Sequence, residues 1–434
     1  MDTAAGYNEA FDENGSLRAP YRAFRNRTGR DPFQPAPETV AALARSPLGD
    51  RYTILPIPLI LNDLEYRETI ARGVRQRALA LQSLFWDVVQ SREPPLPAEV
   101  LQRSLEQEGT SARELAALWK GKTRAHVRFT YAPDLMRDPE GRWSIVEDNV
   151  GCVGGVVDSR LVVERFLAHT GTSLDARVTA AADLVRAVRE FLEENPETPA
   201  SDDVLVLADS DCDPEARRKL QVLRAAGFRV VDGQELQRTH GAEIGAIVNF
   251  RMTDHLRELF GERGLPLMTA PGIDFLGNKL LLPFMDSLVA FYSGEEPVLR
   301  TARTELFQNL PDRQRQPGWI LKKSSGCQGK EVIFLEDLND AQWNALETTI
   351  NGWGGPDWAV LQRRVCASFL PIARAIAWHW FQIELRPIVF VVGDRSCIVS
   401  DHPSGRALSN LDGRRLGNMS QGAHYVAVLR EPSV

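Results

Sequence analysis

The chain has 434 residues, of which 43% are hydrophobic and 25% charged, proportions typical of globular domains. Its 58 acidic residues exceed its 51 lysines and arginines, and the formal net charge of −7 disfavours nucleic acid and anionic membranes as partners. No stretch approaches the roughly 20 apolar residues of a membrane span, and the first residues lack the basic and apolar regions of a signal peptide, so we expect a cytoplasmic protein.

Residues 1–125 are predicted to form an N-terminal arm and a helical segment. The first 50 residues are polar and rich in proline with weak periodicity, which indicates an irregular arm packed on the body. Asn62 is a residue type that caps helices, and apolar residues recur beyond it at helical spacing. Two shorter helices are expected near residues 97–107 and 111–119. Three arginines of the long helix are expected to form a solvated face: Arg72, Arg75 and Arg77.

A β-hairpin with polar side chains is predicted between Asp134 and Asn149. Pro139 and Gly141 mark a turn between two arms rich in apolar residues, so that the arms pair and Asp134 lies opposite the second arm. Because strand side chains alternate, Glu147 and Asn149 share one face. Two carboxylates and one amide suit Mg²⁺, which prefers oxygen ligands and takes the rest from water and phosphates. An ordinary polar hairpin edge is the alternative interpretation.

A glycine-rich loop, residues 151–160, follows the hairpin and leads towards a helix. It has the spacing of neither a dinucleotide fingerprint nor a Walker loop. Its place directly after the hairpin favours contact with a substrate or phosphate, with Arg160 as the candidate anion partner. A surface arginine without a ligand is the alternative.

Residues 171–275 are predicted to form a small α/β unit. Apolar runs at residues 204–207, 228–231 and 246–250 indicate strands, and residues 214–226 indicate a helix. Strands that alternate with helices form parallel sheets, which bind ligands at the carboxyl ends of their strands. The absence of a G-x-G-x-x-G motif argues against a nicotinamide cofactor. Ligand-binding loops are expected at residues 209–213 and 251–254.

The last part of the chain contains elements suited to phosphate binding. A strand from Trp319 delivers Lys322 and Lys323, a loop of small residues turns back, and a second apolar strand ends at Phe334. Small residues let backbone N–H groups approach phosphate oxygens, while a lysine supplies positive charge. Strand alternation allows only one of the two lysines to face a nucleotide. Further strands are predicted within residues 359–365, 381–392 and 425–429.

The order of these elements resembles the circularly permuted ATP-grasp family, a branch of the ATP-grasp carboxylate–amine ligases with the metal-binding hairpin in the N-terminal half. The most specific similarity is that Glu147 follows Asp134 by thirteen positions and Asn149 follows by two more. The resemblance implies an α/β (α+β) fold with a permuted ATP-grasp core, a Rossmann-like (pre-ATP-grasp) domain and an N-terminal helical segment. The domains it implies are residues 1–125, 126–170 (hairpin and glycine loop of the core), 171–275 and 276–434.

The resemblance also implies ATP and Mg²⁺ as cofactors. The metal ligands it implies are Asp134, Glu147 and Asn149. The phosphate contacts it implies are Lys279 and Lys322 together with a flexible loop, in which we assign Ser325, Gly326 and Gly329. This loop departs from the family pattern at Cys327, Gln328 and Glu331.

The remaining roles concern the base and the transferred phosphate. Gln362 is placed where the family contacts the adenine amino group, and Val365 where a backbone N–H meets the ring. Arg386 is similar to an arginine that faces the transferred phosphate, and we assign Lys322 and Arg160 to the same catalytic group. The polar loop Asn418–Gly422 would lead the chain back towards the hairpin.

The activity that the resemblance implies is ATP-dependent carboxylate–amine ligation. A substrate carboxylate would attack the γ-phosphate, and an amine would capture the acyl phosphate to give an amide or peptide bond, with ADP and phosphate as by-products. A phosphotransferase on the same fold and a nucleotide-binding protein without turnover are the alternatives. The expected partners are a small-molecule or peptide carboxylate and an amine; the oligomeric state has no signature in the sequence.

Overall fold

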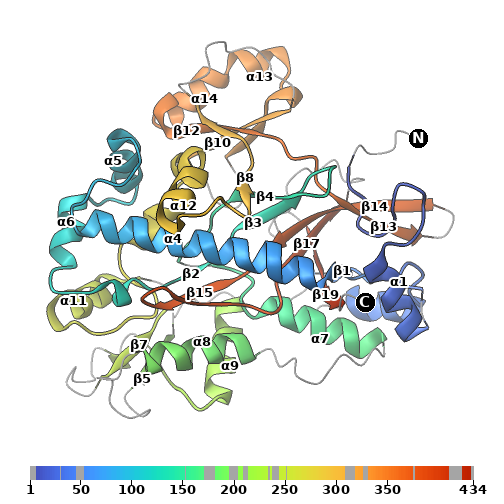
Figure 1. The fold of residues 1–434 in the computed structure, drawn as a ribbon, viewed down its shortest axis with the longest axis horizontal. Helices are drawn as coiled ribbons and strands as arrows, with labels where there is room; N and C mark the ends of the chain where they lie inside the picture. Colours follow the sequence, from blue (N-terminus) through green and yellow to red (C-terminus); the bar gives the residue numbers. More distant parts are fainter. Residues whose placement is uncertain are drawn as a thin grey trace.

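A long helix, α4 (Arg72–Val89), runs across the middle of the molecule in Figure 1. A lobe built on β10 (Trp319–Lys323) and β12 (Ala359–Arg363) lies at the top of this view, and a unit containing β5 (Val204–Ala208) and β7 (Ala246–Val248) lies at the bottom. The residues described by this computed structural model are 6–29, 31–44, 53–151, 153–170, 181–194, 204–208, 214–232, 235–236, 244–250, 252–307, 318–325, 331–374, 377–409 and 423–431.

The N-terminal arm is helical where the sequence indicated an irregular segment. It contains α1 (Ala19–Thr28) and α2 (Pro37–Ala44), so the prediction is wrong for these residues. Pro20 lies in the first turn of α1 and Pro37 begins α2, positions at which the missing N–H has no helical partner to lose. At the end of α1, Gly29 adopts a left-handed φ of 65°. The prolines therefore mark helix starts.

The long helix begins as predicted at Asn62, whose side chain accepts hydrogen bonds from the N–H groups of Leu64 and Glu65. It continues without interruption through α3 (Asp63–Glu65) and a π-helical turn, η1 (Tyr66–Ala71), into α4. The helices that follow it confirm the shorter predicted ones and add a 3-10 turn: α5 (Ala98–Gln107), α6 (Ala112–Leu118) and η2 (Arg124–His126).

The predicted hairpin is confirmed by β3 (Asp134–Arg137) and β4 (Trp143–Glu147), which pair antiparallel. Strand β3 also pairs with β14 (Ala377–Arg386), where Leu135 is opposite Leu385, so the hairpin lies against the C-terminal sheet as expected. The strand order in this seven-stranded sheet is β18-β17-β14-β3-β4-β8, with β13 beside β14. Its other strands are β8 (Arg300–Thr301), β13 (Phe369–Arg374), β17 (Ser404–Ser409) and β18 (His424–Val426).

Two smaller sheets join distant parts of the chain. Strand β1 (Leu59–Asn62) pairs in parallel with β19 (Val428–Glu431). Strand β2 (Phe129–Tyr131), just before the hairpin, pairs with β15 (Val389–Gly393), which in turn pairs with β16 (Ser396–Val399). Both sheets therefore join strands from the first third of the chain to strands near its C-terminal end.

The predicted α/β unit is confirmed as a parallel sheet in the order β6-β5-β7, with β6 at Arg229–Asp232. Helix α9 (Pro214–Ala225) lies where a helix was predicted. The two loops proposed as ligand-binding fall wholly or partly outside the described residues, because residues 209–213 and Arg251 do. The other helices that lie in or next to this unit are α7 (Asp158–Thr170), α8 (Ala181–Glu193) and α11 (Asp254–Arg263).

The lobe is an antiparallel sheet in the order β11-β10-β12-β9. Trp319, Leu321 and Leu361 belong to an apolar core of its own, separate from the main core that includes residues of α4. The other elements of the lobe are β9 (Thr304–Leu306), β11 (Val332–Phe334), η8 (Leu335–Asp337), α13 (Asp340–Asn344), α14 (Leu346–Gly352) and η9 (Pro356–Trp358). The elements that precede it are η5 (Ile273–Gly277), η6 (Lys279–Phe284) and α12 (Met285–Ser293).

Buried apolar side chains of the described residues form three clusters: the main core, the core of the lobe, and one between the α/β unit and β15. The boundaries of the four domains predicted from the sequence stay predictions. Within the described ranges, no helix is both long and apolar enough to cross a membrane.

Candidate active site

The open end of the β3–β4 hairpin gathers charged side chains from four strands. Asp134 and Glu147 are direct partners in the register. Arg386, on β14, donates hydrogen bonds to the two carboxylate oxygens of Asp134 at 2.6 and 2.8 Å. Arg406, on β17, donates to both Asp134 and Glu384, and Glu384 is its register partner on β14. Two arginines therefore enclose one buried aspartate.

These contacts set the ionisation of the cluster. Burial opposes the charge on Asp134, but Arg386 and Arg406 outweigh it and lower the pKa of Asp134 to about 2. Burial raises the pKa of Glu384 to about 7, against the attraction of Arg406. Burial acts to lower the pKa of Arg386, but Asp134 raises it above its ordinary value. At neutral pH, Asp134 and Arg386 are therefore charged, whereas Glu384 titrates.

Glu147 contacts a lysine that the sequence assigned to phosphate binding. The Nζ atom of Lys279 lies 2.8 Å from Oε1 of Glu147. Lys279 is buried at the first position of η6, and its backbone N–H donates to the Ser324 carbonyl at 3.1 Å, just after β10. Asn278 caps η6 by accepting from the N–H of Leu280 at 3.0 Å. The structure thus brings a predicted metal ligand and a predicted phosphate ligand together.

Lys322 and Gln362 join the lobe to the hairpin. The Nζ atom of Lys322 donates to Oε1 of Gln362 at 2.7 Å and to the Val146 carbonyl at 3.2 Å. Gln362 donates to the same carbonyl at 3.1 Å. Burial lowers the pKa of Lys322, and Glu147 acts in the opposite direction. Since Val146 immediately precedes Glu147, these contacts place the lobe beside the carboxylate end of the hairpin.

The other predicted site residues are distributed more widely. Asn149 donates to the Ala132 carbonyl at 3.0 Å and also makes a hydrogen bond that helps to lower the pKa of Asp134, after burial and the arginines. Arg160, on α7, donates to Glu164 at 3.0 Å, and Val365 is half-buried in the linker after β12. Residues outside the described part of the chain are Gly326, Cys327, Gln328, Gly329 and the loop at 418–422.

Sequence reasoning did not identify Gln107, at the end of α5. It accepts hydrogen bonds from Nδ2 of Asn278 at 2.6 Å and from Oγ of Ser324 at 2.9 Å. It also donates to Oγ of Ser325 at 2.6 Å. A glutamine at a helix end has no distinctive sequence signal, although its contacts connect the helical segment to the Lys279 and Ser325 loops.

The expected solvated face of α4 is wrong for Arg77, which is buried. Its guanidinium donates to both carboxylate oxygens of Asp148 at 2.8 and 2.6 Å and to Thr301 at 2.8 Å. Tyr131 donates to Asp148 at 2.7 Å. Asp148 lies between Glu147 and Asn149 in the sequence, so this network fixes the hairpin end from the face opposite the candidate metal ligands. The sequence contains both residues, but nothing in it indicates that Asp148 pairs with Arg77, which lies 71 positions away.

Comparison with known proteins bears on the family and on the fold. Residues 58–245 match the sequence model of the family described as circularly permuted ATP-grasp type 2. The predicted resemblance to this family is confirmed over this segment. The fold also agrees, because a glutathione synthetase-like effector from Globodera pallida, solved in its apo form, superposes with a TM-score of 0.52 and 13% identity. That superposition covers 86% of this chain and 89% of the effector chain.

Sequence relatives occur in several bacteria. An uncharacterised protein of Mycobacterium tuberculosis is 22% identical over 472 aligned positions, covering 96% of this chain and 83% of the relative. A protein of Frankia alni described as a putative glutamate–cysteine ligase is 26% identical over 352 positions, covering 68% of this chain and 39% of that protein. An uncharacterised protein of Synechocystis is 22% identical over 84% of this chain.

The hairpin end fits the metal ion that the family implies. It offers two carboxylates and one amide, all oxygen donors of the kind that Mg²⁺ binds. Asp134 and Glu147 are register partners and Asn149 is within hydrogen-bonding reach of Asp134, so the donors converge. Among the described residues, no cluster of three or more His, Cys, Asp or Glu side chains is suited to a metal. The predicted set therefore depends on the amide of Asn149 as its third donor.

Proposed function

We propose that the protein is an ATP-dependent carboxylate–amine ligase, which forms an amide or peptide bond through an acyl phosphate. The observation that supports this most is the meeting of the two carboxylates at the hairpin end with Lys279, Lys322 and Arg386. Charges of both signs in one buried cluster suit a triphosphate and its metal ion, because each charge in the cluster has a counterpart there.

In the structure these charges are paired with one another. A bound nucleotide would take the place of some of the present partners. Lys279 would leave Glu147, and Lys322 would leave Gln362, to contact phosphate oxygens. Asp134, Glu147 and Asn149 would hold Mg²⁺, which neutralises phosphate charge and orients the chain of phosphates. These residues already lie together, so the cost of reorganising them once the nucleotide is bound is small.

Arg386 would stabilise the negative charge on the transferred phosphoryl group. The substrate carboxylate oxygen attacks the γ-phosphorus, and the bond from this phosphorus to the bridging oxygen breaks to release ADP. The amine nitrogen then attacks the acyl carbon, the bond between that carbon and the phosphate oxygen breaks, and the nitrogen loses a proton. The chain needs no nucleophilic side chain of its own for these steps.

The function is tested by measuring phosphate release from ATP over a panel of carboxylates, with and without amines, and by mass spectrometry of the products. Amine-dependent phosphate release with an amide product is expected. A stable phosphorylated product formed without an amine would instead identify a phosphotransferase. No ATP consumption with any pair, despite binding of a nucleotide, would contradict catalysis.

The choice between the two adjacent lysines of β10 can be tested by nucleotide titration. Lys322→Ala is expected to weaken binding of a non-hydrolysable ATP analogue by about tenfold or more, since a charge-assisted contact to phosphate is lost. Lys323→Ala is the matched control, because Lys323 is the next residue of the strand and is only half-buried. A larger loss in Lys323→Ala than in Lys322→Ala would contradict the assignment.

Glu384 gives a pH-dependent prediction. Its pKa of about 7 in the fold is higher than the value of about 4.3 in an unfolded chain, so between these values the folded protein retains a proton that the unfolded chain releases. Stability should therefore fall as pH rises through this window. Glu384→Gln has no proton to lose, and urea unfolding should show its stability relative to wild type increasing from about pH 5 to pH 8. A pH-independent difference would contradict the raised pKa.

A further inference from the structure

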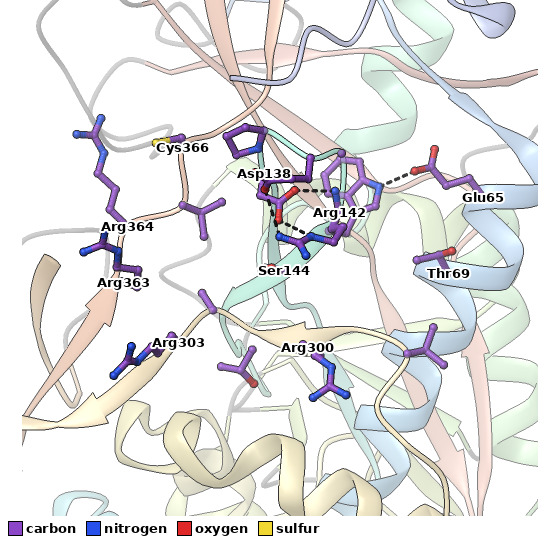
Figure 2. A pocket seen from close by; sticks show the side chains of 18 residues that line it. Glu65, Thr69, Asp138, Arg142, Ser144, Arg300, Arg303, Arg363, Arg364 and Cys366 are labelled. Carbon is purple, nitrogen blue, oxygen red and sulfur yellow. Dashed lines mark hydrogen bonds and ion pairs between the residues drawn. The ribbon is translucent and has the colours of Figure 1, made fainter. Parts of the chain in front are cut away.

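A cavity of about 970 Å³ lies beside the turn of the β3–β4 hairpin (Figure 2). Residues 138–144 of the turn line it, so it is at the opposite end of the hairpin from Asp134 and Glu147. The charged residues of the candidate active site do not line it, whereas Val365 does. Its volume is at the upper end of the range of about 300–1,000 Å³ typical of small-molecule sites.

The lining of the cavity carries an excess of positive charge. Five arginines line it, against three acidic residues. One of the three, Glu65, is already bound by the buried Arg137 and by the indole N–H of Trp143 at 3.1 Å. The lining arginines are Arg142, Arg300, Arg303, Arg363 and Arg364. The lining acids are Glu65, Asp138 and Glu140.

Three of these arginines have acidic partners that do not themselves line the cavity. Ion pairs at exposed sites contribute only about 0–1 kcal/mol, and the side chains of Arg300 and Arg303 are 64% and 72% exposed. A ligand with anionic oxygens would therefore replace weak contacts at Arg300 and Arg303, whereas the Arg364–Glu336 pair, with side chains 27% and 24% exposed, is more shielded from solvent. The pairs are Arg300 with Glu296, Arg303 with Glu305, and Arg364 with Glu336.

The cavity straddles the junction between the lobe and the rest of the molecule. The chain enters the lobe between β8 and β9 and leaves it after β12, and residues of both crossings line the cavity. The crossings are joined by a hydrogen bond from the Arg363 N–H to the Arg303 carbonyl at 2.7 Å. Arg142 and Arg300 lie on the hairpin side, whereas Arg303, Arg363 and Arg364 lie on the lobe side, as Figure 2 shows.

We propose that this cavity binds a small ligand with several anionic groups, carboxylates or phosphates, which bridges arginines on the two sides of the junction. Guanidinium groups bind carboxylates and phosphates through paired hydrogen bonds. Arginines of one side would be enough to hold a ligand with a single anionic group, so a ligand that contacts both sides should carry several such groups. The proposal does not depend on the ligase activity, because it concerns a site at the other end of the hairpin.

The test is calorimetric titration of the full chain with two anionic probes, a triglutamate peptide and tripolyphosphate, and with a triglutamine peptide as neutral control. Each titration is done without and with a saturating non-hydrolysable ATP analogue, so that binding outside the filled nucleotide site is recognised. Modification of the exposed thiol of Cys366, which lines the cavity, gives a second readout, and Cys366→Ser identifies its signal. At least one anionic probe is expected to bind and to slow this modification, and the two arms distinguish carboxylate from phosphate ligands.

The bridging geometry is tested with one variant on each side. Arg300→Gln and Arg364→Gln are each expected to weaken binding of the anionic probe by about tenfold, as for the loss of one charge-assisted contact. Arg92→Gln is the matched control, since Arg92 is exposed, paired with Asp87 and outside the cavity. The proposal is overturned if neither anion binds, if the ATP analogue abolishes binding, or if either cavity variant behaves like the control.

Discussion

Glu147→Ala is expected to lower ATP turnover by at least about 100-fold, because it removes one of the carboxylates that would hold the metal ion. The side chain of Glu147 is 28% exposed, but the change also leaves the buried Lys279 without this carboxylate, so a loss of stability is expected beside the loss of turnover. Steady-state phosphate release and urea unfolding of the same preparation separate the two effects. We expect a loss of turnover much larger than the drop in the folded fraction can explain.

Glu114→Ala is a suitable control, because Glu114 is exposed on α6 and contacts Ser111 of the same helix end. Its turnover should equal that of wild type. Asp134→Ala should lose turnover as well, but it also leaves Arg386 and Arg406 without their shared carboxylate, so its stability should fall. Near-normal turnover in Glu147→Ala would show that this residue is not a metal ligand.

Asp148→Ala is expected to destabilise the protein by about 3–5 kcal/mol, the usual cost of leaving a buried charge without its partner. Arg77 is 1% exposed and would keep its charge with only the Thr301 hydroxyl and the more distant Asp286 close to it. Tyr131 would lose its hydrogen-bond acceptor at the same time. Equilibrium unfolding in urea measures the change.

The matched control for this prediction is Glu296→Ala, which breaks the exposed pair with Arg300 and should change stability by less than about 1 kcal/mol. The double variant Arg77→Met with Asp148→Leu removes both charges and should be less destabilised than the sum of the single changes. Additive losses would mean that Arg77 and Asp148 do not stabilise the fold as a pair.

The sequence was informative where a pattern is local. The turn at Pro139 and Gly141 and the alternation on either side predicted the β3–β4 hairpin, and regular strand and helix signals predicted the parallel α/β unit. The cap at Asn62 located the start of the long helix. Each of these features depends on contacts within a few residues or on side-chain periodicity, both of which a single sequence contains.

The sequence was least informative where burial depends on a distant partner. Arg77 looked like a solvated arginine, because its aspartate lies on another element. The part played by Arg406 followed from the pairing of β14 with β17, which places it opposite Glu384. In the arm, proline content suggested irregular chain, since the sequence does not distinguish a proline that starts a helix from one that prevents it.

The pairing of β3 with β14 has a consequence for how the chain folds. Asp134 and the arginine that pairs with it, Arg386, are 252 positions apart, and the α/β unit and the lobe are synthesised between them. Contacts of such long range slow folding, and an unpaired strand edge is prone to wrong association in the meantime. During synthesis, β3 would therefore lack its β14 partner, and Asp134 would lack Arg386, until residues 377–386 have left the ribosome.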